Sequence, residues 1–342
     1  MNLEGSEKSK IVELLFQKTV AVTILLIIIL ISLFYYGSIH GINIGDFLSR
    51  TMVMATPLIF GTLGEIYVER SGVLNLGIEG MIATGAALGV IGAFAVGNPW
   101  GGVALAMIGS GIMALIFGVI AIKFRGMQVP AGLGLFLFGL GFSGIIGSGY
   151  VGEKLPYAFS KLSIPILGRI PIIGKFLFNQ YPLGYIALIL VPVMWFVLFR
   201  TKIGLYIRSV GENPAAADSS GISVEKIRFL CVFLGGVLAG LAGAYLSVAW
   251  SASWTEGMSA GKGWIVIALT IFALWNPARA LLGAWLFGGI FALKYVLQGS
   301  GIPTNILDML PYLLTLIALS LVLAFSERIG APSALMKPYE RE

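Results

Sequence analysis

Long apolar runs recur along almost the whole chain and are separated by short polar segments. A helix that crosses a membrane needs about 20 mostly apolar residues, because its backbone groups bond to one another and only its side chains meet lipid. We therefore expect an all-α integral membrane protein with about ten transmembrane helices, at approximately 19–37, 51–67, 73–95, 102–122, 129–149, 182–199, 229–250, 263–275, 279–297 and 310–326. The composition agrees, since 58% hydrophobic and 11% charged residues would leave large apolar patches on a water-soluble domain.

The first apolar run is interpreted as a retained span. Lys8, Lys10 and Lys18 precede it, as in a signal peptide, but the following YYGSIHG has no small-residue cleavage site. With the N-terminus in the cytoplasm, the outer Lys and Arg residues are Arg50, Lys154, Lys161, Arg169, Lys175, Lys262 and Lys294, and the rest of the 22 lie inside. Because cytoplasmic loops carry the excess of Lys and Arg, this orientation is favoured. It gives one transmembrane domain over 1–342 with a cytoplasmic N-terminal segment at 1–18, a cytoplasmic loop at 200–228 and a cytoplasmic tail at 327–342.

Several classes of chemistry have no residues to carry them. Cys231 and His40 are the only cysteine and histidine, which excludes a disulfide and the usual zinc, haem and Cys–His catalytic sets within the chain. The net charge of +6 is spread over short loops, so no nucleic-acid partner is expected. No phosphate-binding loop or nucleophile–base arrangement occurs either. Any active transport must therefore use an ion gradient or a separate ATPase.

The segment 64–80, GEIYVERSGVLNLGIEG, interrupts the apolar pattern with polar and charged residues. Ionisable groups at membrane depth cost several kcal/mol unless they are paired or wetted. We expect Glu69 and Arg70 to form a solvated turn at the inner face. Asn75 and Glu79 are four residues apart and are expected on one helix face, lining a transport path. The alternative role for Glu79 is a structural hydrogen bond to a neighbouring helix.

A second interruption, at 255–280, has Trp264 near its outer end and Asn276 followed by Pro277 at its inner end. Breaks of this kind in transporters often face a central cavity. Trp264 and Asn276 are therefore further candidates for the path, although tryptophans here, including Trp250 and Trp254, more often anchor helices at the membrane interface. The two breaks fall in comparable places of the two halves, in the third and eighth spans, which predicts a pseudo-repeat with broken or re-entrant segments.

Two further features concern packing and loops. Gly85 with Gly89 and Gly236 with Gly240 form small-residue pairs that let helix backbones approach closely in lipid. The outer segment 150–181 carries closely spaced Pro and Gly residues, which favours an irregular surface structure over another span. It is either a contact for an external partner or a passive connector.

The polar stretch 203–229 predicts a small helix held between two spans. Asn213 can cap a helix that begins at Pro214, whose missing N–H would have had no partner. Gly221 supplies the left-handed residue that commonly ends a helix, and Ser223 can cap the next one. A short, water-facing helix of this kind is suited to docking a partner, or is simply a capped connector.

Four motifs resemble the membrane permease subunits of bacterial ABC importers, in the branch that serves sugars, branched-chain amino acids and nucleosides. They are ERSGVLNLGIEGM at 69–81, GLYIRSVGENPAAADSSGI at 204–222, GGVLAGLAGAYLS at 235–247 and LWNPARALLGAWLFG at 274–288. The resemblance covers about 52–325 and is closest to nucleoside permeases. Ser209 stands where the family often has alanine, and Cys231 and Phe233 stand where it often has small residues.

The resemblance implies that the loop at 211–221 is a coupling helix that fits a cleft in a cytoplasmic ATPase. Carried over, the docking positions are Gly211, Glu212, Asn213, Pro214, Ala217 and Gly221. It also implies a second, related but distinct permease subunit, an extracytoplasmic substrate-binding lipoprotein, and ATP–Mg used only by the ATPase. The expected function is nucleoside import across the bacterial cytoplasmic membrane, with no enzymatic activity in this chain. A sugar or amino-acid permease and an ion-coupled secondary carrier are the alternatives.

Overall fold

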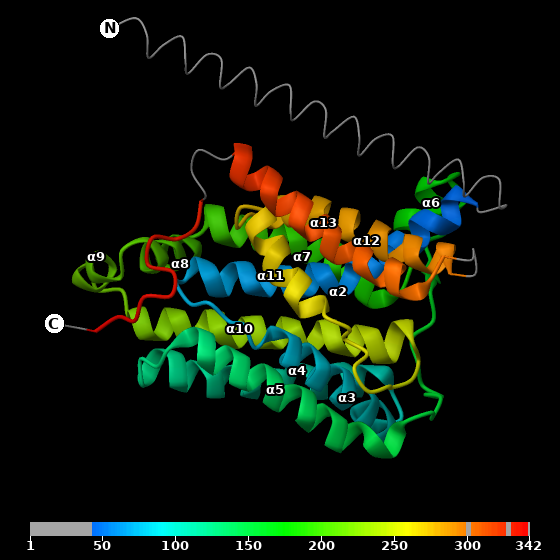
Figure 1. Cartoon of the computed structure of the whole chain (residues 1–342), viewed down its shortest axis with the longest axis horizontal. Helices are drawn as coiled ribbons and strands as arrows, with labels where there is room; N and C mark the ends of the chain where they lie inside the picture. The colour runs from blue at the N-terminus through cyan, green and yellow to red at the C-terminus, as the bar shows by residue number, and fades with distance from the viewer. Residues whose placement is uncertain (1–42, 299–301, 326–329, 341–342) are drawn as a thin grey trace, which may run out of the picture.

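The computed structural model describes residues 43–298, 302–325 and 330–340 (Figure 1). The predicted span at 19–37 and the segment 1–18 lie outside the described residues. The α-helices are α2 (Ile44–Arg70), α3 (Ile78–Val96), α4 (Pro99–Gly118), α5 (Gln128–Gly147), α6 (Ile173–Leu177), α7 (Pro182–Arg200), α8 (Lys202–Glu212), α9 (Pro214–Ser219), α10 (Val224–Ala244), α11 (Lys262–Phe272), α12 (Pro277–Leu297) and α13 (Thr304–Phe325).

Among the described residues, seven helices are long and apolar enough to cross a membrane. They are α2, α3, α4, α5, α7, α10 and α12; α4 is prolonged by the π-helix η1 (Val119–Lys123) and α10 by the π-helix η4 (Tyr245–Trp250). The prediction of an all-α membrane protein is confirmed. The predicted crossing at 263–275 is wrong as a full span, because α11 has only 11 residues.

The helices form a bundle with α2 inside it. Figure 1 shows α3, α4 and α5 on one side of α2 and α10, and α7, α12 and α13 on the other. Helix α2 is buried from Thr51 to Glu69 on all of its faces, so it forms the centre of the bundle. On α4, by contrast, Ile108, Ile112 and Ile116 are exposed at four-residue spacing. They form a stripe that suits contact with lipid.

The predicted glycine pairs lie at helix crossings. A Cβ atom on Gly85 of α3 would come within 2.7 Å of the Cα of Gly240 on α10. A Cβ atom on Gly236 would come within 2.3 Å of the Ala114 Cβ on α4. No side chain fits between these backbones, so close helix packing accounts for both pairs.

Three helices begin at an Asn–Pro dipeptide. The side chain of Asn98 accepts a hydrogen bond from the backbone N–H of Trp100 at the start of α4, Asn213 does so at α9, and Asn276 does so at α12. Proline loses nothing at the first helical position, because its N–H would have no partner there. The dipeptide at residues 276–277 is therefore a helix start in the same way as the other two.

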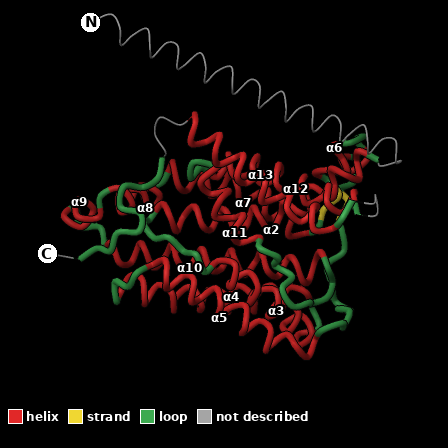
Figure 2. The backbone as a smooth tube through the Cα atoms, in the orientation of Figure 1, coloured by secondary structure: helices red, strands yellow, loops and turns green. Residues whose placement is uncertain are grey.

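The segment between α5 and α7 is irregular, as predicted. Figure 2 shows it as loops with two short strands, β1 (Leu162–Ser163) and β2 (Asn179–Gln180). These strands pair antiparallel, with Leu162 opposite Gln180. The segment also holds the 3₁₀-helix η3 (Leu167–Arg169) and α6 and packs on the start of α2, where Lys175 forms an ion pair with Asp46 at 2.7 Å.

Candidate functional site

The polar stretch at 203–229 folds as two short helices at one end of the bundle. Helix α9 lies beyond the ends of the neighbouring helices in Figure 1. Asn213 Oδ1 accepts a hydrogen bond from the N–H of Ala216 at 3.0 Å, and Ser223 Oγ accepts one from the N–H of Lys226 at 3.5 Å. Gly221 has φ +82°, a conformation that strains other residues. The structure thus places all three cap residues as the sequence predicted.

The six expected docking positions divide into two groups by exposure. Glu212, Asn213 and Gly221 are exposed, and Pro214 is half-buried. Ala217 is buried in an apolar cluster with Val210 and Val224. Gly211 is buried too, and a Cβ atom there would lie 2.0 Å from the carbonyl oxygen of Arg70. Gly211 and Ala217 therefore hold the loop on the body of the protein and do not form part of an accessible surface.

At the first break, residues 71–77 connect α2 to α3 without helical structure. The expectation that Asn75 and Glu79 share a helix face is wrong, because α3 begins only at Ile78. Asn75 is buried, its N–H donates to Glu65 Oε1 at 3.2 Å, and its Oδ1 accepts from the N–H of Gly77 at 3.0 Å. These hydrogen bonds of Asn75 stabilise the non-helical segment 71–77.

Glu79 is buried at the start of α3 and faces the N-terminus of α11. Its Oε1 accepts from the N–H of Gly261 at 2.8 Å, and its Oε2 accepts from the N–H of Gly263. A helix N-terminus presents free N–H groups and a partial positive charge, so a carboxylate is stabilised there. The geometry therefore fits the alternative of a structural bond to a neighbouring helix, and a role in the path stays a prediction.

At the second break, the C-terminal end of α11 meets the C-terminal end of α2. Glu69 is buried and accepts a hydrogen bond from Trp275 Nε1, while Arg70 Nε donates to the Trp275 carbonyl at 3.3 Å. The expectation of a solvated turn is wrong for Glu69. The reason is that the turn is covered by a segment more than 200 residues later in the chain, which supplies its hydrogen-bond donor.

The side chains of the remaining path candidates take no part in these bonds. Trp264 is half-buried in α11 and packs edge-on against Phe136 of α5, with ring centroids 5.3 Å apart. Asn276 caps α12 through a 2.9 Å bond from the N–H of Ala278. Trp254, expected at the membrane interface, is instead buried against α3 and Gly147. Lys262, expected in an outer loop, is buried at the start of α11.

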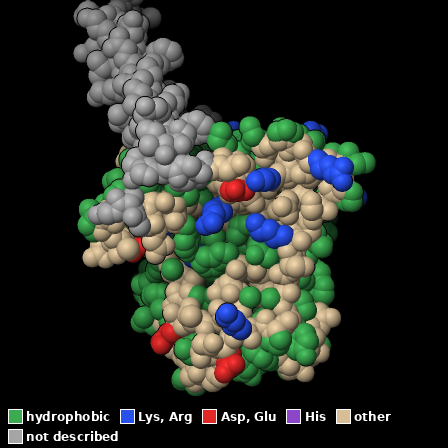
Figure 3. Space-filling model, turned by 90° about the vertical axis from the view of Figure 1, so that its right-hand side faces the viewer, with side chains coloured by type: hydrophobic (Ala, Val, Ile, Leu, Met, Phe, Trp, Pro, Cys, Tyr) green, Lys and Arg blue, Asp and Glu red, His purple; other side chains and the backbone are tan. Residues whose placement is uncertain are grey.

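The end of the bundle opposite α9 is hollowed. Figure 3 shows Lys and Arg side chains around a hollow lined by hydrophobic side chains. At this end Lys161 Nζ donates to Ser49 Oγ at 3.3 Å and lies 5.7 Å from the ring centroid of Tyr181. Partial burial and the nearby charge of Arg50 lower the pKa of Lys161.

A comparison with protein families identifies the chain. Residues 47–319 match the family described as the branched-chain amino acid transport system / permease component, which covers most of the chain and all the breaks described above. The chain belongs to this permease family. The predicted resemblance to ABC importer permeases is therefore confirmed, and the relatives are transport subunits, not enzymes.

Three curated relatives match the permease over most of its length and over nearly all of theirs. A putative glucose ABC transporter permease of Haloferax volcanii is 38% identical over 321 residues, 86% of this chain and 97% of the relative. A guanosine ABC transporter permease of Bacillus subtilis is 38% identical over 306 residues, 84% and 94% of the two chains. A nucleoside ABC transporter permease of Lactococcus lactis is 34% identical over 296 residues, 80% and 91%. No solved structure gives a significant match.

Three contributors to the contacts at the helix breaks and at α9 were not predicted from the sequence: Trp275, Arg228 and the segment 331–340. Trp275 stands beside the noted Asn276, and its indole N–H could have been read as a donor for a buried carboxylate. Arg228 is buried near the start of α10, where it donates to the carbonyl of Ser71 at 3.2 Å. A buried cation at a membrane boundary is itself a signal of a specific partner. Residues 331–340 gave no signal, because the residues of the bundle to which they bond lie more than 100 positions away in the sequence.

Proposed function

We propose that this permease forms the translocation path of an ATP-driven importer for nucleosides in the bacterial cytoplasmic membrane. The observation that carries the proposal is α9, a two-turn helix capped at both ends that projects from one end of the bundle. A chain without a phosphate-binding loop does not hydrolyse ATP itself, and a rigid projecting helix is suited to dock the ATPase that an ABC importer requires. Glu212, Asn213, Pro214 and Gly221 supply the accessible part, and Gly211 and Ala217 hold it in place.

The proposed partners follow from the two ends of the bundle. A cytoplasmic ATPase that uses ATP–Mg docks on α9, and an extracytoplasmic binding lipoprotein delivers substrate to the hollowed opposite end. A second, related permease subunit completes the path, with both termini of each chain in the cytoplasm. The chain itself needs no cofactor. Alternate closure of the two ends would then move the substrate between them.

Nucleosides are proposed as substrates because two of the relatives above are named guanosine and nucleoside permeases. A sugar is the second candidate, since the putative glucose permease is equally similar. Membership of the ABC permease family leaves the ion-coupled carrier without support. Buried carboxylates would have favoured that carrier, but Glu65, Glu69 and Glu79 all accept hydrogen bonds from the helix breaks.

Uptake assays separate the two substrates. Cells that lack the gene and cells that carry it are given labelled guanosine or labelled glucose, with unlabelled nucleosides, sugars and leucine as competitors. We expect guanosine uptake to depend on the gene and to be inhibited by nucleosides alone. Gene-dependent glucose uptake with unchanged guanosine uptake would establish the sugar permease instead. Co-purification of a nucleotide-hydrolysing subunit with the permease tests the ATPase partner.

A further inference from the structure

Residues 331–340, which follow α13 in the sequence, lie against α8 and α9. We call this segment the C-terminal strap. Its first contact is with the end of α8, where Glu212 Oε2 accepts hydrogen bonds from both Ser333 Oγ, at 2.9 Å, and the Ser333 N–H, at 3.2 Å. The N–H of Ala334 donates to the Gly211 carbonyl at 2.9 Å, and Ala334 is itself buried. The strap therefore bonds to the residues just before α9.

The second contact joins the strap to the first helix break. The N–H of Met336 donates to the Gly72 carbonyl at 3.2 Å. Arg228 lies between the two segments, since its Nη1 donates to the Lys337 carbonyl at 3.2 Å and its Nε donates to the Ser71 carbonyl. Because a buried guanidinium needs acceptors to offset its desolvation, these bonds fix the strap on the turn at 71–72.

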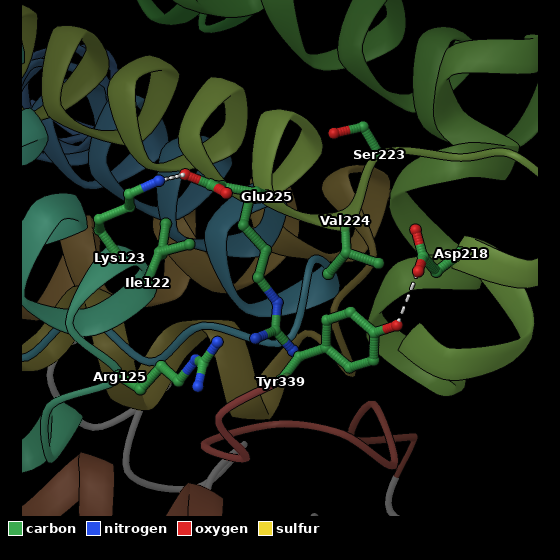
Figure 4. Close-up of a pocket in the computed structure, with 9 residues that line it drawn as sticks. Ile122, Lys123, Arg125, Asp218, Ser223, Val224, Glu225 and Tyr339 are labelled. Atoms are coloured by element: carbon green, nitrogen blue, oxygen red, sulfur yellow. Dashed lines mark hydrogen bonds and ion pairs between the residues drawn. The ribbon is translucent and has the colours of Figure 1, made fainter. Parts of the chain in front are cut away.

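The third contact is with α9 itself. Tyr339 donates a hydrogen bond to Asp218 Oδ2 at 3.0 Å, shown in Figure 4. Its ring packs on the apolar cluster formed by Val210, Ala217 and Val224. A cavity of about 260 Å³ lies beside this contact, and Glu340 forms an ion pair with Arg125 at its edge. The strap thus touches α8, α9, α10 and the turn at 71–72.

We propose that the C-terminal strap is a positioning element that holds the coupling helix α9 against the first helix break. A continuous set of contacts joins the base of α9 to both helix breaks. Gly211 packs directly on the Arg70 carbonyl, and Arg70 and Glu69 bond to Trp275 at the second break. With the strap in place, α9 and the turn at 71–72 move as one body. A displacement of α9 by a docked ATPase therefore also displaces the residues of both helix breaks.

A tail that merely stabilises the fold would have a different signature. It would lower the amount of folded permease, and uptake and ATP hydrolysis would fall together. A strap that positions α9 changes the number of substrate molecules imported per ATP hydrolysed, because an unheld α9 moves without moving the turn. This ratio is independent of the amount of folded protein, so it separates the two roles.

The test uses the double variant Ser333→Ala, Tyr339→Phe in the full chain, which removes two side-chain hydrogen bonds and leaves the buried residues in place. Lys123→Ala is the matched control, because its ion pair with Glu225 lies at the same cavity, is more than half exposed and involves no residue of the strap. Deletion of residues 331–342 is the stronger variant.

The proposal rests on the proposed function, so the first measurement must not depend on the substrate. Limited trypsin digestion of the purified permease meets this need. Arg208 and Lys226 flank α9. Loss of two hydrogen bonds is expected to raise cleavage at these residues about tenfold, because each bond opposes local opening. The Lys123→Ala control is expected to be cleaved at the wild-type rate.

The import ratio is then measured with the assembled transporter in proteoliposomes. We expect the double variant to hydrolyse ATP but to import several-fold less guanosine per ATP. Unchanged cleavage at Arg208 and Lys226, or an unchanged import ratio in both strap variants, would overturn the proposal. If the wild-type transporter imports no nucleoside, the proposed substrate fails, while the digestion result still decides whether the strap holds α9.

Discussion

At the scale of single residues, buried carboxylates accept hydrogen bonds from the segments that interrupt or begin helices. Glu65 binds the N–H of Asn75, Glu69 binds the Trp275 indole, and Glu79 binds the N-terminus of α11. Polar backbone groups inside a membrane protein need partners, and an interrupted helix exposes several of them. The carboxylates accept hydrogen bonds from N–H groups that have no partner within an α-helix.

Glu79→Gln is expected to destabilise the permease. Both carboxylate oxygens accept backbone N–H groups, but glutamine has only one acceptor and would turn its NH₂ group toward a donor. The free energy of unfolding should fall by about 1–3 kcal/mol, measured as a lower thermal midpoint in detergent. Glu256→Gln, at an exposed carboxylate, is the control. Normal stability combined with altered substrate affinity would instead place Glu79 in the path.

Gly211→Ala is expected to separate α8 from the end of α2. The new Cβ atom would lie 2.0 Å from the Arg70 carbonyl, so one of the two backbones must shift. Overpacking of this kind costs about 1–3 kcal/mol. Guanosine uptake per ATP should fall. Gly141→Ala is a matched control on α5, because no atom beyond the adjacent turns of its own helix backbone lies within 4 Å of its new methyl group. Equal ratios in the two variants would show that the contact does not contribute to coupling.

At the scale of elements, the ends of helices were predicted correctly where the residues that cap them are close in the sequence. Asn213, Pro214, Gly221 and Ser223 all lie within a few residues of the groups they cap. The extents of α3 and α11 were predicted wrongly, since α3 begins at Ile78 and α11 is too short for a full span. Apolar runs do not reveal where a buried helix gives way to extended backbone, since both are equally apolar. That boundary depends on partners such as Glu65 and Glu79 on other helices.

Replacement of Asn213 and Pro214 by glycine should uncouple ATP hydrolysis from uptake. The variant loses the cap that binds the N–H of Ala216 and the rigid first residue of α9. The same change at Asn98 and Pro99, which start α4 in the same way, is the control for lost helix capping. Unchanged uptake in the 213–214 variant, with normal insertion, would refute the docking role of α9.

At the scale of the whole molecule, the bundle has a buried central helix, a lipid-facing periphery and two unlike ends. One end carries α9 with the strap, and the other is hollowed and basic (Figures 1 and 3). Two unlike ends are consistent with the proposed transport of a solute from a binding protein at one end toward an ATPase at the other. The two-half repeat expected from the sequence stays a prediction, although its two proposed breaks do meet at Glu69 and Trp275.

Single-cysteine labelling tests the orientation of the permease. Native Cys231 is fully buried and serves as an unreactive background. Ser219→Cys on α9 and Lys154→Cys at the opposite end both introduce exposed thiols. In intact cells, a membrane-impermeant maleimide should label residue 154 alone, and residue 219 should react only after the membrane is opened. The reverse pattern would mean that α9 lies outside, where no ATPase can reach it.

The sequence by itself determined the membrane class, most of the spans, the caps of α9 and the family. These depend on the length of apolar runs and on hydrogen bonds between residues close in the chain. Only the tertiary structure decided that Glu69 is buried, that Glu79 faces α11 and that the strap lies on α9. The partners in these contacts are more than 100 residues apart. Their pairing depends on how whole helices pack, and no local pattern records it.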